Sequence, residues 1–150
     1  MAKRIVIMAG GTGGHVFPAL AVAQYLLEQG WEVSWLGTER GLESRVVPEN
    51  NIALDKIAVA GIRGKGVFSK ITAMLGLFKA CFQAASVLRK RKPNVVLGMG
   101  GFVAGPSGLM AKVLGIPLVI HEQNRVVGTT NRLLARLANR VLQAFPESFK

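Results

Sequence analysis

The chain has 150 residues, half of them hydrophobic, with 19 lysines and arginines against 8 acidic residues and a formal net charge of +11. This composition excludes a disordered chain, and the single cysteine excludes a disulfide framework and a cysteine-rich metal site. The charge indicates a partner that carries phosphates, which leaves nucleic acid, anionic lipid or a phosphorylated substrate.

The N-terminal stretch combines a short apolar run, residues 5–8, with the segment Gly10-Gly11-Thr12-Gly13-Gly14-His15. The run is too short for a signal peptide, and we expect a buried strand there and a helix over residues 19–29, with Pro18 in its first turn. Glycines let the backbone approach a ligand closely, and free amides at a helix start attract anions. We therefore interpret the segment as a phosphate or sugar-phosphate loop rather than a plain turn. It is not the dinucleotide fingerprint, because Val16 occupies the third glycine position.

The rest of the chain alternates apolar runs with helix-like stretches. Continuous Val, Ile and Leu runs are typical of parallel strands covered on both faces. The pattern predicts an α/β fold, a Rossmann-like doubly wound parallel sheet that binds ligands at the carboxyl ends of its strands. The expected strands are residues 5–8, 31–37, 52–59, 95–98, 116–121 and 140–145. The expected helices are 19–29, 42–47, 69–91, 106–114 and 129–137, and residues 61–66 are expected to form a basic loop.

Two further loops follow strands at the same predicted edge. The segment Gly98-Met99-Gly100-Gly101-Phe102-Val103-Ala104-Gly105-Pro106 offers a second nest of amides, suited to a substrate with two phosphates, although close strand–helix packing explains it too. The segment His121-Glu122-Gln123-Asn124 places four polar side chains after an apolar strand. Glu122 and Asn124 are candidates for hydroxyl contacts, whereas His121 suits a site and a core position equally well. Three loops at one edge predict a single ligand site.

His15 is the candidate general base. The positive end of a helix dipole opposes protonation of its imidazole, and a neutral imidazole can accept a proton. The alternative is a histidine that only donates to a phosphate. No Asp-x-Asp, His/Cys cluster or HExxH motif occurs, so the sequence predicts neither a metal nor a cofactor.

The helix expected over residues 69–91 has two apolar stripes, and only one of them can pack on the sheet. Cations, including the run Arg89-Lys90-Arg91-Lys92, lie nearby. We therefore expect the second stripe to contact the surface of an anionic membrane. Lys79 and Gln83 interrupt the apolar run, so no membrane-spanning helix is predicted. The stripe expected to pack on the sheet contains Ala73, Leu77, Ala80, Ala84 and Leu88. The second stripe, expected to contact the membrane, contains Phe68, Ile71, Leu75, Phe78 and Phe82.

The three loop motifs, in this order and on these loops, resemble those of the bacterial peptidoglycan N-acetylglucosaminyltransferases. The resemblance is to the N-terminal half of that family and covers residues 3–145. It implies an inverting GT-B enzyme of two Rossmann-like domains that transfers N-acetylglucosamine from UDP-GlcNAc to the MurNAc 4-hydroxyl of lipid I, forming lipid II. It also implies a peripheral location on the cytoplasmic side of the inner membrane. The C-terminal donor domain is expected to be absent from residues 1–150, and this half alone is expected to be inactive.

The resemblance also implies roles for individual residues. Phe102 stands where the family often has Tyr, and Lys112 where an aromatic residue can occur. The catalytic base would be His15, with Glu122 in reserve. The residues implied for donor UDP-GlcNAc are Thr12, Gly13, Gly14 and Asn124, those for acceptor lipid I are Gly100, Gly101, Phe102 and His121, and those for the membrane are Ile71, Leu75 and Phe78.

Other function classes remain open. The chain also fits the half of another GT-B glycosyltransferase with a lipid acceptor. A dinucleotide-binding oxidoreductase domain would need an acidic residue at the tip of the second strand, where Gly37-Thr38 stands. A nucleic-acid-binding module is disfavoured, because the aromatic residues lie on the amphipathic helix rather than among the cations. We therefore expect no nucleic-acid partner.

Overall fold

The computed structural model describes residues 2–59 and 66–149. The expected basic loop at 61–66 lies outside the described residues except for Gly66. The strands are β1 (Arg4–Ala9), β2 (Glu32–Gly37), β3 (Ala53–Lys56), β4 (Val95–Gly100), β5 (Leu118–Glu122) and β6 (Arg140–Gln143). The helices are α1 (Gly13–Glu28), α2 (Glu43–Glu49), α3 (Val67–Arg91), α4 (Ala104–Val113) and α5 (Thr129–Leu134).

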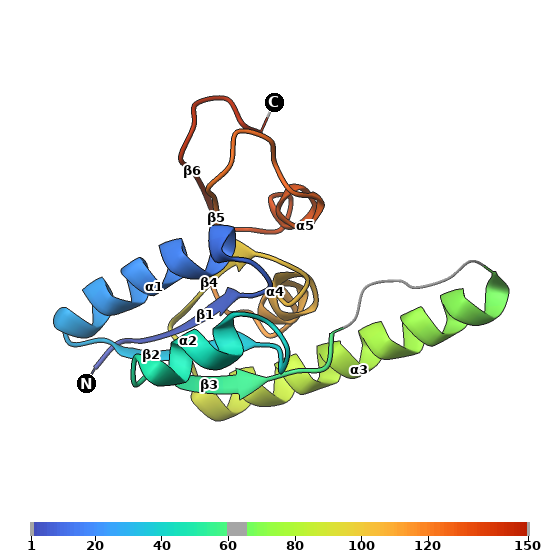
Figure 1. The fold of residues 1–150 in the computed structure, drawn as a ribbon, viewed down its shortest axis with the longest axis horizontal. Coiled ribbons are helices and arrows are strands. Elements are labelled where there is room, and N and C mark those ends of the chain that lie inside the picture. The colour runs from blue at the N-terminus through green and yellow to red at the C-terminus, as the bar shows by residue number, and fades with distance from the viewer. Residues whose placement is uncertain (1, 60–65, 150) are drawn as a thin grey trace.

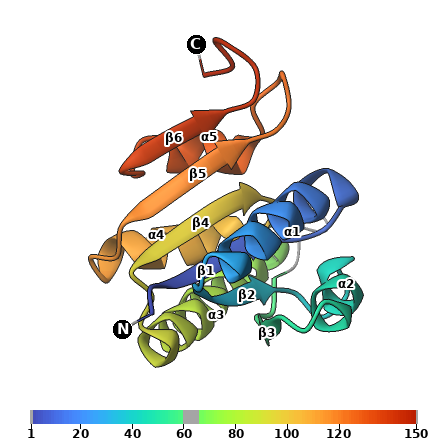
Figure 2. The same ribbon diagram turned by 90° about the vertical axis from the view of Figure 1, so that its left-hand side faces the viewer.

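The six strands form one parallel sheet in the order β3-β2-β1-β4-β5-β6 (Figure 2). This is the doubly wound order, in which the order of strand addition reverses between β1 and β4, and it confirms the predicted fold class. Along β1 the side chains alternate between two cores. Val6 and Met8 pack with α3, α4 and α5, while Ile5 and Ile7 pack with α1 and α2 on the other face.

Helix α1 begins six residues earlier than the sequence predicts. Thr12 has the extended backbone of an N-cap residue, and the helix runs on directly from Gly13. Val16 and Ala19 are fully buried against the sheet, and this packing outweighs the low helix propensity of the glycines. Pro18 therefore lies in the second turn, not the first, where its missing N–H leaves the Gly14 carbonyl without a helical partner.

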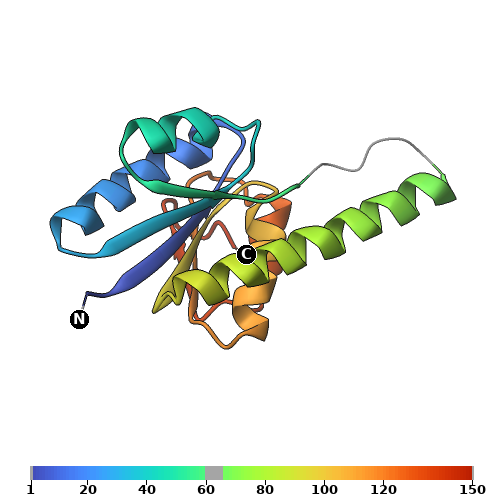
Figure 3. The same cartoon turned by 90° about the horizontal axis from the view of Figure 1, so that it is seen from below.

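Helix α3 is packed over its second half only. Its buried residues are Ala80, Ala84, Ala85 and Leu88, while the first half projects beyond the sheet (Figures 1 and 3). Leu77, expected on the packing stripe, is exposed for this reason. The whole helix is long and apolar enough to cross a bilayer by length and composition. The projecting half is only about 20 Å long at 1.5 Å per residue, less than the ~30 Å hydrocarbon core of a bilayer.

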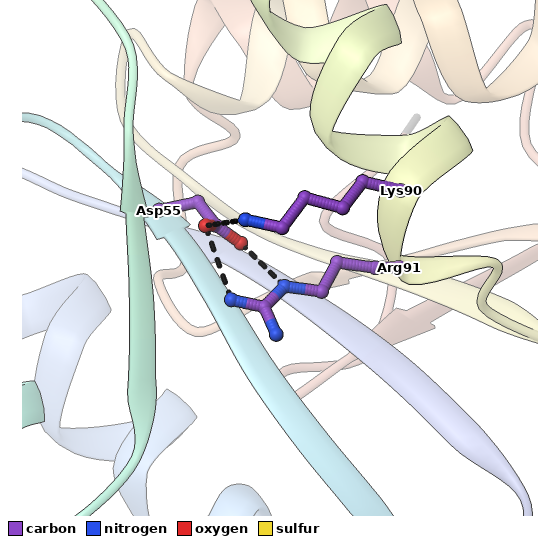
Figure 4. A network of polar contacts seen from close by, with 3 residues as sticks. All are labelled: Asp55, Lys90 and Arg91. Atoms are coloured by element: carbon purple, nitrogen blue, oxygen red, sulfur yellow. Dashed lines mark hydrogen bonds and ion pairs between the residues drawn. The ribbon is translucent and has the colours of Figure 1, made fainter.

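The C-terminal end of α3 is held by a carboxylate of β3. The guanidinium of Arg91 donates two hydrogen bonds to Asp55, from Nε to Oδ2 at 2.8 Å and from Nη2 to Oδ1 at 3.1 Å (Figure 4). Lys90 Nζ lies 3.8 Å from Asp55 Oδ1. The hydrogen bonds to Asp55 raise the pKa of Arg91, although burial opposes the effect. This pairing joins the C-terminal end of α3 to the edge strand β3.

Candidate ligand site at the carboxyl ends of the strands

The loops after β1 and β4 touch each other through their backbones. Gly101 has φ +91°, and a Cβ there would overlap the carbonyl oxygen of Gly10. Gly100, at φ +116°, faces the ring of His15, and a Cβ there would lie 2.6 Å from His15 Nδ1. Both positions therefore need glycine, because an L side chain rarely adopts this backbone and no space is left for one.

The three predicted loops border one pocket of about 400 Å³. Its size falls in the range of small-molecule sites. Of the residues predicted from the sequence, Thr12, His15, Gly100, Gly101, Phe102 and Glu122 line it. The first turn of α5 adds Thr129, Thr130 and Asn131 to the lining, and these three residues were not predicted from the sequence. The predicted convergence of the loops is confirmed.

Four predicted residues lie beside the pocket rather than in its lining. Gly13 and Gly14 are the first two residues of α1, and the Thr12 side chain makes no capping hydrogen bond to them. Helix geometry gives their amides no intrahelical acceptor, so they offer an anion site at the pocket's edge. The ring of His121 instead contacts Gln123 of the β5 loop, residues 123–128, and Asn124 donates to the carboxylate of Glu122 at the end of β5.

A buried carboxylate supports the glycine loop. Glu43 is fully buried, and its carboxylate accepts hydrogen bonds from the Gly11 N–H at 3.0 Å, the Thr38 N–H at 2.9 Å and the Thr38 hydroxyl at 2.8 Å. These contacts join the turn after β2 to the turn after β1. Glu43 was not predicted from the sequence, because an acidic residue in the first turn of a helix usually occupies an exposed position, where it interacts favourably with the helix dipole.

The two histidines of the chain are connected through one glutamine. Gln123 Oε1 lies 3.3 Å from His15 Nδ1, while Gln123 Nε2 lies 3.0 Å from His121 Nδ1 and donates to the His121 carbonyl oxygen at 2.9 Å. Burial lowers the pKa of His121, although the charge of Glu122 opposes this. Both rings are half-buried. The sequence motif contained Gln123, but only the structure shows what it contacts.

The Glu122 carboxylate is used inside the protein. The residue is 1% exposed and accepts four hydrogen bonds, from the backbone N–H groups of Asn124 and Gly128 and from the side-chain amides of Asn124 and Asn131. Burial alone would raise the pKa of Glu122, but these hydrogen bonds outweigh it and lower the pKa. A carboxylate has about four lone-pair positions. All are occupied, which favours a role in bracing the β5 loop over the reserve role as base and over a hydroxyl contact.

Asn131 presents an unsatisfied acceptor at the pocket. It is 2% exposed, and its Nδ2 donates to the His121 carbonyl and to Glu122 Oε2. Within the described part of the chain, its Oδ1 has no hydrogen-bond partner. A buried acceptor without a partner is unfavourable by about 1–3 kcal/mol, so a ligand hydroxyl or N–H would be well placed there.

The three residues predicted for membrane contact are all exposed on the projecting half of α3. They are Ile71, Leu75 and Phe78. Over residues 2–59 and 66–149 no group of three or more His, Cys, Asp or Glu side chains could hold a metal ion.

Comparison with known proteins gives consistent results. Residues 5–143 match the N-terminal domain of glycosyltransferase family 28. The chain is 67% identical to a protein of Methylococcus capsulatus named UDP-N-acetylglucosamine–N-acetylmuramyl-(pentapeptide) pyrophosphoryl-undecaprenol N-acetylglucosamine transferase, over 100% of this chain and 42% of that protein. A protein of the same name from Yersinia pestis is 54% identical over 98% of this chain and 41% of its own length. The crystal structure of Acinetobacter baumannii MurG superposes with a TM-score of 0.89 at 50% identity, over 99% of this chain and 43% of that one. The chain thus spans less than half the length of each of these proteins.

Proposed function

Because the chain belongs to glycosyltransferase family 28, whose N-terminal domain it forms, we propose that it is the acceptor-binding half of an enzyme that transfers N-acetylglucosamine from UDP-GlcNAc to lipid I. The observation that carries the proposal is the contact between the two glycine loops, which places His15 in one pocket with two sets of backbone amides. The proteins that match almost the whole chain are named for this transfer.

The acceptor diphosphate would bind at the loop after β4. Gly100 and Gly101 turn this loop with positive φ, and it leads into the N-terminus of α4. Amides at such a turn and the positive end of a helix dipole both favour phosphate. Phe102 is 70% exposed at the pocket and has no hydroxyl to donate, so it would supply apolar contact only. His121 would act indirectly, since its ring nitrogen faces Gln123.

The donor would reach the site from the second domain expected of the family. Its phosphates would meet the amides of Gly13 and Gly14 beside Thr12, where the start of α1 favours negative charge. The Oδ1 atom of Asn131 would accept from a substrate hydroxyl, whereas Asn124 would hold the loop through Glu122.

The reaction needs a base for the acceptor hydroxyl. The MurNAc 4-oxygen attacks the anomeric carbon of GlcNAc, a new C–O bond forms, and the bond to UDP breaks with its electron pair leaving on the phosphate oxygen. The hydroxyl proton passes to the free ring nitrogen of His15. General-base catalysis of this kind contributes about 10²–10⁴ in rate.

The projecting half of α3 would hold the enzyme at the cytoplasmic face of the inner membrane. Its exposed apolar residues lie on a half-helix too short to span the bilayer, and the chain's positive charge suits anionic lipid. This arrangement would bring a lipid-linked acceptor to the pocket without extracting it from the membrane.

Ligand binding to residues 1–150 tests the proposal. We expect a short-chain lipid I analogue to shift the amide resonances of residues 100–102 and the ring resonances of His15, and UDP-GlcNAc to shift the amides of residues 12–14 more weakly. NAD serves as the competing ligand for the oxidoreductase alternative, and a single-stranded oligonucleotide for the nucleic-acid alternative. Binding of NAD at these loops without binding of the acceptor analogue would contradict the proposed function.

A further inference from the structure

We propose that Gln123 is a positioning residue that fixes the tautomer of His15, with the proton on Nδ1 and the lone pair on Nε2. The hydrogen bond between His15 Nδ1 and Gln123 Oε1, 3.3 Å long, carries the inference, together with the contacts at the other end of the same amide. The tautomer assignment stands on geometry alone, and its catalytic consequence rests on the proposed function.

The orientation of the Gln123 amide follows from its surroundings. One end of the amide lies 2.9 Å from the backbone carbonyl oxygen of His121, and a carbonyl oxygen can only accept. That end must therefore be the NH₂ group. The thioether of Met99, 3.8 Å from the same nitrogen, is a weak acceptor and agrees with this choice. The oxygen end consequently faces His15.

The amide orientation decides the proton positions on both rings. Because Gln123 Oε1 is an acceptor, the facing His15 Nδ1 must carry the proton, so in the neutral ring Nε2 does not. Because Gln123 Nε2 is a donor, His121 Nδ1 must accept, and the His121 proton sits on its own Nε2. Burial lowers the pKa of His121, which keeps that ring neutral and able to accept.

The His15 ring has little freedom to exchange its two nitrogens. Its Nδ1 edge lies against the backbone of Gly100, close enough that a Cβ would come within 2.6 Å. This close contact leaves Nδ1 directed at Gln123 and Nε2 on the opposite edge of the ring. A histidine base whose Nε2 already carries a proton cannot accept one there. Gln123 therefore determines the fraction of His15 that is in the tautomer able to act as the base.

NMR of the imidazole nitrogens in residues 1–150 at pH 8, where a histidine of ordinary pKa is neutral, tests the assignment. We expect the Nδ1-protonated pattern for His15 and the Nε2-protonated pattern for His121. Gln123→Met keeps the length of the side chain and removes both ends of the amide, and it should convert His15 to a mixture containing the Nε2-protonated form. Gln24→Met is the matched control, since Gln24 also donates one side-chain hydrogen bond, to Asn50, and lies on α1.

Gln123→Glu is the second variant, because it keeps an acceptor facing His15. It should restore the Nδ1-protonated pattern. An Nε2-protonated His15 in the unaltered protein, or an unchanged His15 pattern in a folded Gln123→Met variant, would overturn the proposal. If Gln123→Met fails to fold, the Gln123→Glu variant decides. Loss of the Nδ1-protonated pattern of His15 in a folded Gln123→Glu variant overturns the proposal, and retention of that pattern supports it.

Kinetics separate this inference from the proposed function. With the chain joined to the remaining part of the Methylococcus relative, Gln123→Met should lower kcat by less than the ~10²–10⁴-fold loss expected when the general base itself is removed. The KM for UDP-GlcNAc should change little, and Gln123→Glu should recover part of the loss in kcat. A joined enzyme without transferase activity would contradict the proposed function and leave the NMR result standing. A changed tautomer with unchanged kcat would refute the catalytic role of Gln123.

Discussion

Replacing Gly101 with alanine should separate the two glycine loops that form the site. Two effects add at this position. The backbone has φ +91°, where an L residue is strained by about 1–3 kcal/mol. The new Cβ would also overlap the carbonyl oxygen of Gly10 and lie 3.1 Å from its carbonyl carbon, so the loop after β1 must move. Overpacking against atoms that cannot rotate away adds about 1–3 kcal/mol.

Gly30→Ala isolates the first effect. Gly30 has φ +86° at the end of α1, and nothing lies within 4 Å of the position of its Cβ. Urea denaturation should therefore show Gly101→Ala to be less stable than Gly30→Ala by about 1–3 kcal/mol. Amide spectra should change at residues 10–15 in the Gly101 variant alone. Equal losses of stability with an unchanged glycine loop would refute the claim that the loops are in contact.

Three further predictions concern the membrane, acid stability and the separate half. Phe78→Ser should weaken binding to anionic liposomes by up to about 1.5–3 kcal/mol. It should leave the unfolding free energy almost unchanged, since the Phe78 side chain is 57% exposed. Phe17 is similarly exposed on α1, so Phe17→Ser should not weaken liposome binding, and unfolding of the Phe78 variant would place this face of α3 in the core. The lowered pKa values of His121 and Glu122 mean that the unfolded chain binds more protons, so stability should fall as pH drops below the ordinary values of 6.5 and then 4.5. Glu122→Gln should remove the lower part of that fall, and a denaturation profile identical to that of the unaltered protein would contradict this. Residues 1–150 should unfold cooperatively and transfer no sugar from UDP-GlcNAc. Turnover without a second domain would refute the proposal that this half binds the acceptor and depends on a separate domain for the donor.

The strand positions and the doubly wound fold class were predictable, because buried parallel strands such as β1 and β4 leave a strong apolar signal. The start of α1 was not, since Gly13 and Gly14 disfavour a helix locally and only the burial of Val16 and Ala19 against the sheet forces one. The two stripes of α3 were visible in the sequence. That only its second half meets the sheet depends on the length of the sheet, which no local pattern encodes.

The site was predictable as a set of loops but not as a set of contacts. Glycine clusters and polar strand ends marked the right edge of the sheet. The sequence could not show that Glu43 supports the first loop, because these partners lie 32 residues apart in the chain. The predicted helix over residues 129–137 placed Asn131 at its start, but not its contacts with Glu122 and the pocket. Glu122 was predicted as a cleft carboxylate because burial cannot be read from a single acidic residue, and four donors from its own loop and α5 make that burial tolerable.

The most direct measurement is the effect of His15→Ala on turnover when the chain is joined to the remaining part of the Methylococcus relative. We expect the unaltered joined enzyme to transfer GlcNAc to a lipid I analogue. We expect His15→Ala to lower kcat by about 10²–10⁴ and to leave the affinity for UDP-GlcNAc nearly unchanged. A near-normal kcat for His15→Ala together with loss of turnover for Glu122→Ala would contradict the role of His15 as the base. A loss of substrate affinity alone would reduce His15 to a phosphate ligand.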